Sequence, residues 1–455
     1  MNFFGLTTLS LCQIAWIVLG VLWVVRKHDE IPLLISTLLF YVFTFRLWAL
    51  LMGWASPTDL GNFGFAPIDF KSALDVQAVA TLGETILLSV YMLEQRRRID
   101  VPHTFASPEL MGWLKPRVIA LGVICILISL LARRSVGIQL ASGKSMGFEV
   151  SSYLILLPLG LIGVVILIAA LWKSGAFHTN GERFVAVLFF VAISYLTFQP
   201  SMRFQFLGWF VAVTIILSSG QSVVRRAQVL GIGLIGAVAL FAVAGELRNA
   251  EDPTVDVEQG AWERLAFAQD ANMLDGFVLL RQVYPEMLGY SYGGEHLEIL
   301  ERPIPRSWWP DKPVGGYMNK LGIITADTGF TLGISPSLFG SFYQEGGLVG
   351  VVLLSIIYGF GFGCLVSFST RIVPLTGLLI RGSLAAAIVP LLRGGDLAGI
   401  YAWFGMSFWP CLLVLWLRRG EFFARIPCRQ QFAGAVPVRM ERKVWCEKWI
   451  DRNPF

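Results

Sequence analysis

Charged residues are scarce in this sequence. They make up 15% of its 455 residues, whereas soluble globular domains carry about 25%. Apolar residues reach 55% of the chain, and its mean hydropathy is +0.65. The apolar residues are gathered in long runs, so the composition excludes an ordinary soluble enzyme. It predicts an all-α integral membrane protein.

Common signatures of metal and cofactor chemistry are also missing. No Cys/His pair has metal-ligand spacing, no glycine-rich loop fits a phosphate or a dinucleotide, and no internal repeat is visible. We therefore expect no metal and no cofactor. The net charge of +5 is spread over short loops and the C-terminal tail, as orientation signals are. We expect no nucleic acid among the partners.

Cysteines suited to disulfides are absent as well. Four of the six cysteines fall inside apolar runs and two lie in the basic tail: Cys12, Cys125, Cys364 and Cys411, then Cys428 and Cys446. None lies in a segment that we place outside the cell, where disulfides form. We therefore expect no disulfide.

Long apolar runs dominate what is present. We predict about eleven spanning helices of roughly 16–25 residues, the length that crosses a bilayer. They lie near 4–25, 31–55, 73–94, 117–133, 150–172, 184–200, 204–220, 229–245, 346–367, 374–392 and 399–417. The N-terminal segment MNFFGLTTLS has no positive region and no obvious cleavage site, so the first run reads as a span rather than a signal peptide.

Lysine and arginine are divided unequally between the two sides of this arrangement. One side holds most of them, including Arg26, Lys27, the triplet at 96–98 and the tail after Arg418. Cytoplasmic loops carry such an excess. We therefore expect a multi-pass protein of the plasma (inner) membrane. An odd number of spans then puts the N-terminus outside and the C-terminus in the cytoplasm.

These expectations divide the chain into four parts. Residues 1–245 form transmembrane helices 1–8, and residues 246–345 form one large extracytoplasmic (periplasmic) loop with short helices. Residues 346–417 form helices 9–11, and residues 418–455 form a basic cytoplasmic tail. We expect the loop to pack on the membrane helices as a lid, because binding and catalytic residues favour loops on rigid scaffolds.

The loop contains an unusual stretch, ERPIPRSWWPDKP, at residues 301–313. Its four prolines remove backbone donors and fix φ, so no continuous helix can run through it. A rigid, extended segment is suited to holding charged groups at fixed positions. The alternative is a kinked connector whose adjacent tryptophans lie at the membrane interface, where tryptophan is enriched.

Three charged residues lie inside apolar spans: Arg46, Glu84 and Arg381. Such a charge costs roughly 2.5–3.5 kcal/mol on insertion scales, so it normally faces a cavity or another charge. Arg46 and Glu84 are on consecutive helices at compatible depth, which predicts an ion pair between them. Arg381 has no obvious partner in its own helix, which favours a groove for an anionic lipid head group.

Further cations lie at the outer ends of predicted helices. Arg203 falls in the first turn of a helix, where free backbone N–H groups and an arginine together make an anion site. The alternative is an arginine that snorkels to lipid phosphates. Arg393 is explained by its place at a helix C-terminus before Gly394, with Asp396 free to cap the next helix. Arg248 lies just beyond the membrane surface.

His296 is the only one of four histidines on the outer side. A lone histidine in a Glu-His-Leu run is more often an ordinary surface residue than a base.

Two stretches of the second half resemble a known family. The pattern from Tyr292 through the proline-tryptophan segment, followed by GISPSLFGSFYQEGGLVG at 333–350, is similar to the oligosaccharide repeat-unit polymerases. These are the Wzy-type O-antigen and exopolysaccharide polymerases. The Arg203 and Arg393 positions also resemble arginine-bearing positions of that family. The resemblance covers about 197–398 well, and the first half by topology alone.

The sequence departs from the family pattern at two positions. Glu345 stands before Gly346, where the family has an uncharged residue. His296 stands where it has an aromatic or aliphatic residue, which puts a catalytic role for His296 in doubt.

The resemblance implies a lipid-glycosyltransferase-like (GT-C type) architecture and metal-independent polymerisation of glycan repeat units. The donor would be a growing chain on undecaprenyl pyrophosphate, and the acceptor a single repeat unit on the same carrier. Membrane lipids, a chain-length regulator and a flippase would be further partners. A hydroxyl of the acceptor would attack the anomeric carbon of the donor, and the lipid pyrophosphate would leave.

This chemistry needs cations that hold the pyrophosphate, and arginine does so with a planar fork. Flat aromatic rings suit sugar faces, and a base near the attacking hydroxyl would assist. The candidate catalytic residues are Arg306, Arg203, Arg393, Arg248 and His296. The candidate substrate-binding residues are Trp308, Trp309, Lys312, Glu345 and Arg381.

Three other functions stay open on the sequence alone. A ligase that joins a finished glycan to a lipid core would share the architecture. A polysaccharide transporter or flippase is favoured by inverted repeats and broken helices, and the sequence shows neither. A non-catalytic assembly partner is the third alternative.

Overall fold

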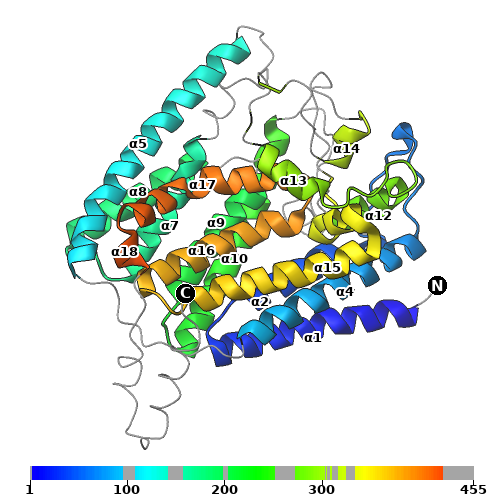
Figure 1. Cartoon of the computed structure of the whole chain (residues 1–455), viewed down its shortest axis with the longest axis horizontal. Coiled ribbons are helices and arrows are strands. Elements are labelled where there is room, and N and C mark those ends of the chain that lie inside the picture. Colours follow the sequence, from blue (N-terminus) through cyan, green and yellow to red (C-terminus); the bar gives the residue numbers. More distant parts are fainter. Residues whose placement is uncertain are drawn as a thin grey trace, which may run out of the picture.

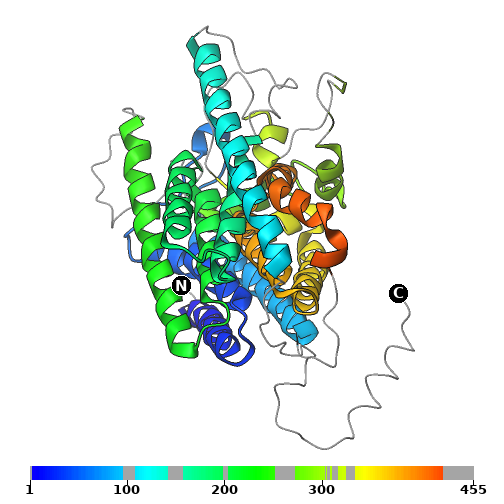
Figure 2. The same cartoon turned by 90° about the vertical axis from the view of Figure 1, so that its left-hand side faces the viewer.

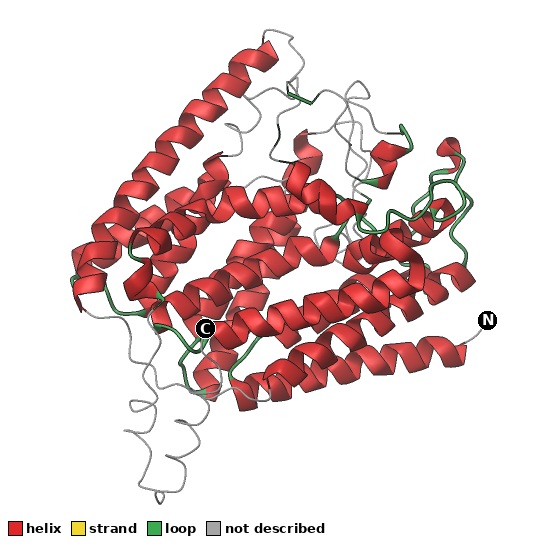
Figure 3. Ribbon diagram, in the orientation of Figure 1, coloured by secondary structure: helices red, strands yellow, loops and turns green. Residues whose placement is uncertain are grey.

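A computed structural model describes residues 3–95, 108–141, 157–197, 203–251, 272–302, 304, 308–309, 316–323 and 334–423. Within these ranges every regular element is a helix (Figure 3). The described part of the chain therefore has the all-α class that its hydropathy predicts.

The first half supplies α1 (Phe3–Lys27), α2 (Ile31–Leu39), the π-helix η1 (Phe40–Phe45), α3 (Arg46–Leu51), the 3-10 turn η2 (Gly61–Phe63), α4 (Phe70–Gln95), α5 (Pro108–Ala141), the 3-10 turn η3 (Leu157–Leu159), α7 (Gly160–Lys173), α8 (Asn180–Thr197), α9 (Arg203–Ser218) and α10 (Val223–Glu251). The second half supplies α12 (Met273–Val283), α13 (Gly294–Glu301), α14 (Tyr317–Lys320), α15 (Ser337–Ser369), α16 (Pro374–Arg393), α17 (Leu397–Leu417) and α18 (Arg419–Phe422).

Nine helical stretches in the described ranges are long and apolar enough to cross a membrane, and two shorter apolar helices accompany them. Each of the eleven overlaps one predicted span. The shorter two are α7 and the stretch Phe206–Ser218 within α9. The prediction of an all-α, multi-pass membrane protein is confirmed, while the number of crossings stays a prediction.

Helix α7 is buried among five other helices. All its residues from Gly160 to Leu171 are buried, and it packs against α5, α8, α9, α16 and α17. At Gly163 an added Cβ would lie 2.7 Å from the carbonyl oxygen of Ser407 on α17, so glycine permits the backbones to approach closely. Helix α5, in cyan, lies on the outside of the bundle (Figures 1 and 2).

Helices α4 and α15 pack along a face of small residues. Ser355, Gly359 and Gly363 recur every four residues on α15, and an added Cβ on Gly359 would lie 2.4 Å from the carbonyl oxygen of Leu87. Close approach at small residues is how membrane helices associate without a hydrophobic driving force. These contacts bring α15 beside the first helices of the chain.

The bundle has two distinct ends (Figure 1). At one end, which we name the α12 end, the short helices α12, α13 and α14 meet the first residues of α15 and the α16–α17 connection. Ser335 donates to the carbonyl of Gly394 at 3.0 Å there. At the opposite end, the α18 end, Thr376 at the start of α16 donates to the carbonyl of Phe422 at 2.7 Å.

Candidate functional site

Helix α15 turns sharply at Gly346 and Gly347, and this turn builds the candidate site. The rings of Phe342 and Tyr358 lie 4.9 Å apart, although sixteen residues of straight helix would separate them by about 24 Å. Gly347 has φ +61° and ψ −143°, a region that glycine alone enters without strain. The segment 337–345 therefore folds over the start of the spanning part of α15.

Glu345 lies at this turn and is buried. Its carboxylate accepts from the backbone N–H of Gly293, from the hydroxyl of Ser291 at 3.2 Å and from the backbone N–H of His296 at 3.2 Å. Its Oε1 also lies 2.7 Å from Nδ1 of His296. These contacts fix the carboxylate against the first turn of α13.

His296 links this carboxylate to two tyrosines on the membrane helices. Its Nε2 lies 2.9 Å from the hydroxyl of Tyr358 on α15, and Tyr401 on α17 donates to that hydroxyl at 2.8 Å. The Tyr358 proton then points to Nε2, and the Nδ1 proton points to Glu345. The site therefore holds a continuous chain of contacts, Glu345–His296–Tyr358–Tyr401.

Helix α13, which carries His296, also carries the acids Glu295 and Glu298. Lys320 of α14 pairs with Glu295, and with Glu298 at 2.8 Å; Gln344 also donates to Glu295. Burial raises the pKa of Glu295 to about 7, against the opposing effect of Lys320. Burial alone would lower the pKa of Lys320, but the two carboxylates hold it above its usual value.

The α16–α17 connection closes the site on another side. Asp396 caps α17 by accepting from the backbone of Gly399 at 2.9 Å, as predicted, and it also accepts from Arg302 at 3.2 Å. Arg393 is the last residue of α16, and positive φ angles at Gly394 and Gly395 follow it. The backbone of Gly395 donates to the hydroxyl of Ser341 at 3.2 Å.

The structure thus brings His296, Glu345 and the Arg393 turn to the α12 end. Trp308 is 81% exposed and Trp309 is half-buried. The backbone of α9 begins at Arg203, in agreement with its predicted place in a first turn.

Other predicted site residues are described only in part or not at all. Arg248 lies near the end of α10, and like that of Arg203 its side chain lies outside the described part of the structure. Arg306 and Lys312 lie wholly outside the described residues.

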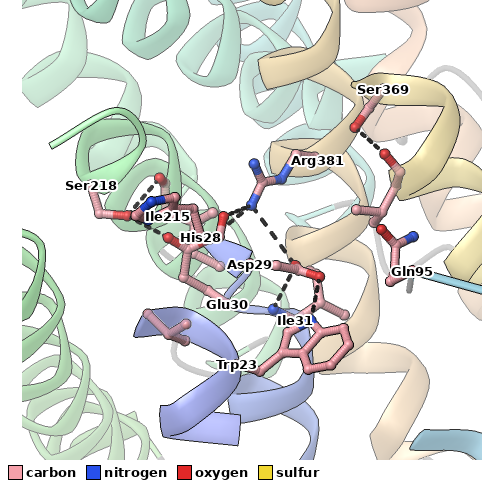
Figure 4. Close-up of polar contacts among 12 residues, drawn as sticks. Trp23, His28, Asp29, Glu30, Ile31, Gln95, Ile215, Ser218, Ser369 and Arg381 are labelled. Atoms are coloured by element: carbon pink, nitrogen blue, oxygen red, sulfur yellow. Dashed lines mark hydrogen bonds and ion pairs between the residues drawn. The ribbon is translucent and has the colours of Figure 1, made fainter. Parts of the chain in front are cut away.

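Arg381 lies elsewhere, beside Asp29 and Glu30 (Figure 4). Its guanidinium lies 3.0 Å from Glu30 and 3.8 Å from Asp29, in the α1–α2 connection. Arg226 of α10 lies 3.5 Å from the same Glu30. Twelve residues of helix, about 18 Å, separate Arg381 from Arg393, so the two cannot share one binding site. Arg381 is a member of an ion network that joins α2, α10 and α16.

The predicted ion pair between Arg46 and Glu84 is wrong. Arg46 pairs instead with Asp275 of α12, at 2.7 Å, with both side chains buried. Asp275 also accepts from the backbone and hydroxyl of Thr58, each at 2.9 Å. Glu84 accepts from Gln13 at 3.0 Å. A neighbouring helix was the natural expectation, but the folded loop supplies a closer acid.

Sequence reasoning missed several residues of this end. Tyr358 and Tyr401 lie in apolar runs, where an isolated tyrosine reads as packing. Glu295 and Lys320 lie in different short helices of the loop. Polar groups inside or beside apolar segments are only a weak sign of a site in the sequence. The turn of α15 and the fold of the loop are what bring these four residues to one end.

The part of the chain that the structure describes contains no group of three His, Cys, Asp or Glu side chains placed to hold a metal ion. No family model, no curated protein and no solved structure matches the chain.

Proposed function

We propose that this protein is a membrane glycosyltransferase, with a GT-C type arrangement, that polymerises lipid-linked oligosaccharide repeat units. One observation carries the proposal. The described parts of the stretches that resemble the repeat-unit polymerases bring Glu345, which is buried, to half-buried His296 at the α12 end. Glu345 and His296 are the two departures from the family pattern, and they lie 2.7 Å apart. They therefore act as one unit that replaces the family's uncharged contact.

The chemistry assigns a different task to each part of this end. The acceptor hydroxyl forms a bond to the anomeric carbon of the donor, the bond from that carbon to the pyrophosphate breaks, and the pyrophosphate leaves with its charge. Tyr358 takes up the hydroxyl proton and passes its own proton to Nε2 of His296, while Glu345 keeps its contact with Nδ1. Arg393 and the other outer arginines stabilise the leaving pyrophosphate.

Aromatic side chains at this end suit the sugar. Trp308 and Tyr292 are each 81% exposed, and their flat faces are free to stack on pyranose rings. Their apolar rings also suit a position at the membrane interface, close to a polyprenyl carrier. The proposal places the α12 end outside the plasma membrane, with eleven crossings and a cytoplasmic C-terminus.

The deciding experiment is glycan chain length in a deletion background that expresses each variant at matched level. We expect Arg203→Ala, Arg306→Ala, Arg393→Ala and Glu345→Gln each to lower polymerisation roughly a hundredfold, the usual effect of losing one positioned donor or its support. Arg306→Lys should also be impaired, because lysine lacks the planar fork.

Arg371→Ala is the matched control, because this exposed arginine lies near the α18 end. It should keep chains of normal length. Normal chains from Arg203→Ala, Arg306→Ala, Arg393→Ala and Glu345→Gln alike would overturn the proposed site. Long chains in cells that lack the protein would overturn the polymerase function itself.

Membrane transport is a second candidate function. It is favoured by Glu84, a buried acid inside a spanning helix, because ionisable residues at such depth often belong to ion or proton pathways. Transfer of single repeat units across the membrane, without any change in chain length, would distinguish transport from polymerisation.

A further inference from the structure

A chain of buried polar side chains runs across three helical elements of the first half. Gln77 on α4 donates to the hydroxyl of Thr44 at 2.7 Å. Thr44 donates to the side-chain carbonyl of Gln13 on α1, and Gln13 donates to Oε2 of Glu84 at 3.0 Å. All four side chains are buried. Each of these side chains donates to the next, and the chain ends on a carboxylate.

The element that presents Thr44 is not a regular α-helix. Residues Phe40–Phe45 form a π-helical segment between α2 and α3. π-Helical turns are rare and appear frequently at functional sites. Here the π-helical segment carries Thr44 to a position between Gln77 and Gln13.

Three oxygens beside this chain lack hydrogen-bond partners among the described residues: Oε1 of Glu84, Oε1 of Gln77 and Oγ1 of Thr81. Their residues stand at positions i, i+4 and i+7 of α4, which is one face of a helix. Arg46 follows Thr44 by two residues, but its guanidinium is held by Asp275. Within the described ranges Glu84 has no ion-pair partner, and its Oε1 accepts no hydrogen bond.

The polar groups approach Glu84 from one side of the membrane. Thr58, Asp275 and Arg46 lie at the α12 end, and Gln77 and Glu84 follow more deeply along α4. Glu84 lies fourteen residues, about 21 Å, along α4 from Phe70.

Beyond Glu84 an apolar stretch separates it from the next buried polar side chains of α4, Tyr91 and Gln95, which bond to Asp29 and Ser367. Thr85 of the next position accepts from Trp16 at 3.0 Å. Leu87 and Leu88 then follow, both fully buried. Polar side chains therefore connect Glu84 to the α12 end, and apolar packing separates it from the α18 end.

We propose that Glu84 is a proton-binding site inside the membrane, loaded from the α12 end. An unpaired carboxylate in an apolar interior is far costlier than the neutral acid. A proton that adds to Oε1, which has no hydrogen-bond partner among the described residues, neutralises the group. Gln13 keeps its contact with Oε2 throughout. Release of that proton restores the carboxylate.

This inference is independent of the proposed glycosyl transfer. Transfer of a sugar from a pyrophosphate at the α12 end does not require a proton about 21 Å along α4. Binding or release of a proton at Glu84 changes the charge where α1, η1 and α4 meet. The proton therefore couples to the packing of α1, η1 and α4.

Dicyclohexylcarbodiimide tests the proposal directly. This apolar reagent reacts with a protonated carboxyl group in an apolar environment and leaves a stable N-acylurea that mass spectrometry detects. The full chain, reconstituted in lipid nanodiscs, is treated at pH values from 5 to 9. We expect an adduct on the Glu84 peptide at low pH that decreases at least tenfold as the pH rises.

The variants Glu84→Gln and Glu94→Gln provide matched controls on one helix. Glu84→Gln should abolish the adduct, and Glu94→Gln, near the α18 end of α4, should leave it unchanged. If Glu84→Gln fails to fold, Glu84→Asp keeps an acid at that position and should still be labelled.

Two results overturn the proposal. Labelling that stays constant from pH 5 to 9 shows that Glu84 does not release its proton, and labelling that is absent even at pH 5 shows that it does not take one up. A decrease caused by sodium but not by choline at constant pH shows that the ligand is sodium instead.

Discussion

Buried charges in this chain find partners in distant segments. Arg46 and Asp275 are 3% and 0% exposed and lie 229 residues apart in sequence. Taking both charges out of water is costly, but once they are buried the loss of one partner leaves an uncompensated charge. This pair attaches α12, and with it the loop, to the first helices.

Asp275→Ala should therefore lower the free energy of unfolding by about 3–5 kcal/mol. Glu286→Ala, an exposed acid three residues beyond α12, should change it by less than about 0.5 kcal/mol. Thermal unfolding in one detergent measures both. Equal effects of the two substitutions would show that Arg46 and Asp275 do not form a stabilising pair.

A second residue-scale prediction concerns pH. Burial raises the pKa of Glu295 from its usual 4.5 to about 7. Because the folded protein binds this proton more tightly than the unfolded chain does, the stabilisation is complete below pH 4.5. It is lost as the pH rises to about 7. Hydrogen exchange of α13, corrected for intrinsic rates, should show greater protection at pH 5 than at pH 8.

Glu295→Gln should remove this dependence, because the amide is neutral at every pH. Protection of α13 that rises between pH 5 and 8 in the unchanged protein would contradict the prediction.

At the scale of elements, the turn in α15 decides the architecture of the α12 end. The turn lets one continuous stretch of sequence supply both a spanning helix and the short helix 337–345 above it. Gly347 holds the turn in the left-handed region, and an added Cβ there would lie 2.8 Å from the hydroxyl of Tyr290. The position therefore excludes a side chain for two separate reasons.

Gly347→Ala should destabilise the protein by about 1–3 kcal/mol, the cost of a strained backbone position. Gly361→Ala, in the regular part of the same helix, has no atom within 4 Å of its added Cβ and should be neutral or slightly stabilising. Denaturation midpoints of the two variants give the comparison. A neutral Gly347→Ala would mean that the turn does not need glycine.

At the scale of the whole molecule, the two ends differ in chemistry. The α12 end carries the short helices, the histidine–carboxylate pair and exposed aromatic rings. The α18 end carries Arg26, Lys27, Arg225, Arg371 and Arg418 near its helix termini. The excess of basic residues at the α18 end is typical of a cytoplasmic face.

We therefore predict that Tyr292→Cys, in a cysteine-free background, reacts with a membrane-impermeant thiol reagent in intact cells. Tyr292 is 81% exposed, so burial does not protect it. A variant that keeps only Cys446 of the tail should react after the membrane is permeabilised. Labelling of Cys446 but not of position 292 in intact cells would reverse the orientation.

The sequence by itself determined the membrane class and the approximate positions of the helices. A spanning helix must be apolar over its whole length, because lipid cannot hydrogen-bond or solvate charge. This requirement is local, so runs such as 374–392 predicted α16 (Pro374–Arg393) closely. Capping is equally local, which is why Asp396 was predicted at the start of α17.

Tertiary structure alone decided which polar groups meet. Arg46 could pair with any acid at its depth, and the position of α12 made that acid Asp275. Arg381 lacked a partner in its own helix and found Glu30, 351 residues away. The Glu345–His296–Tyr358–Tyr401 chain exists only because α15 turns at Gly347. Such contacts depend on how helices are placed in three dimensions, which no local pattern of residues specifies.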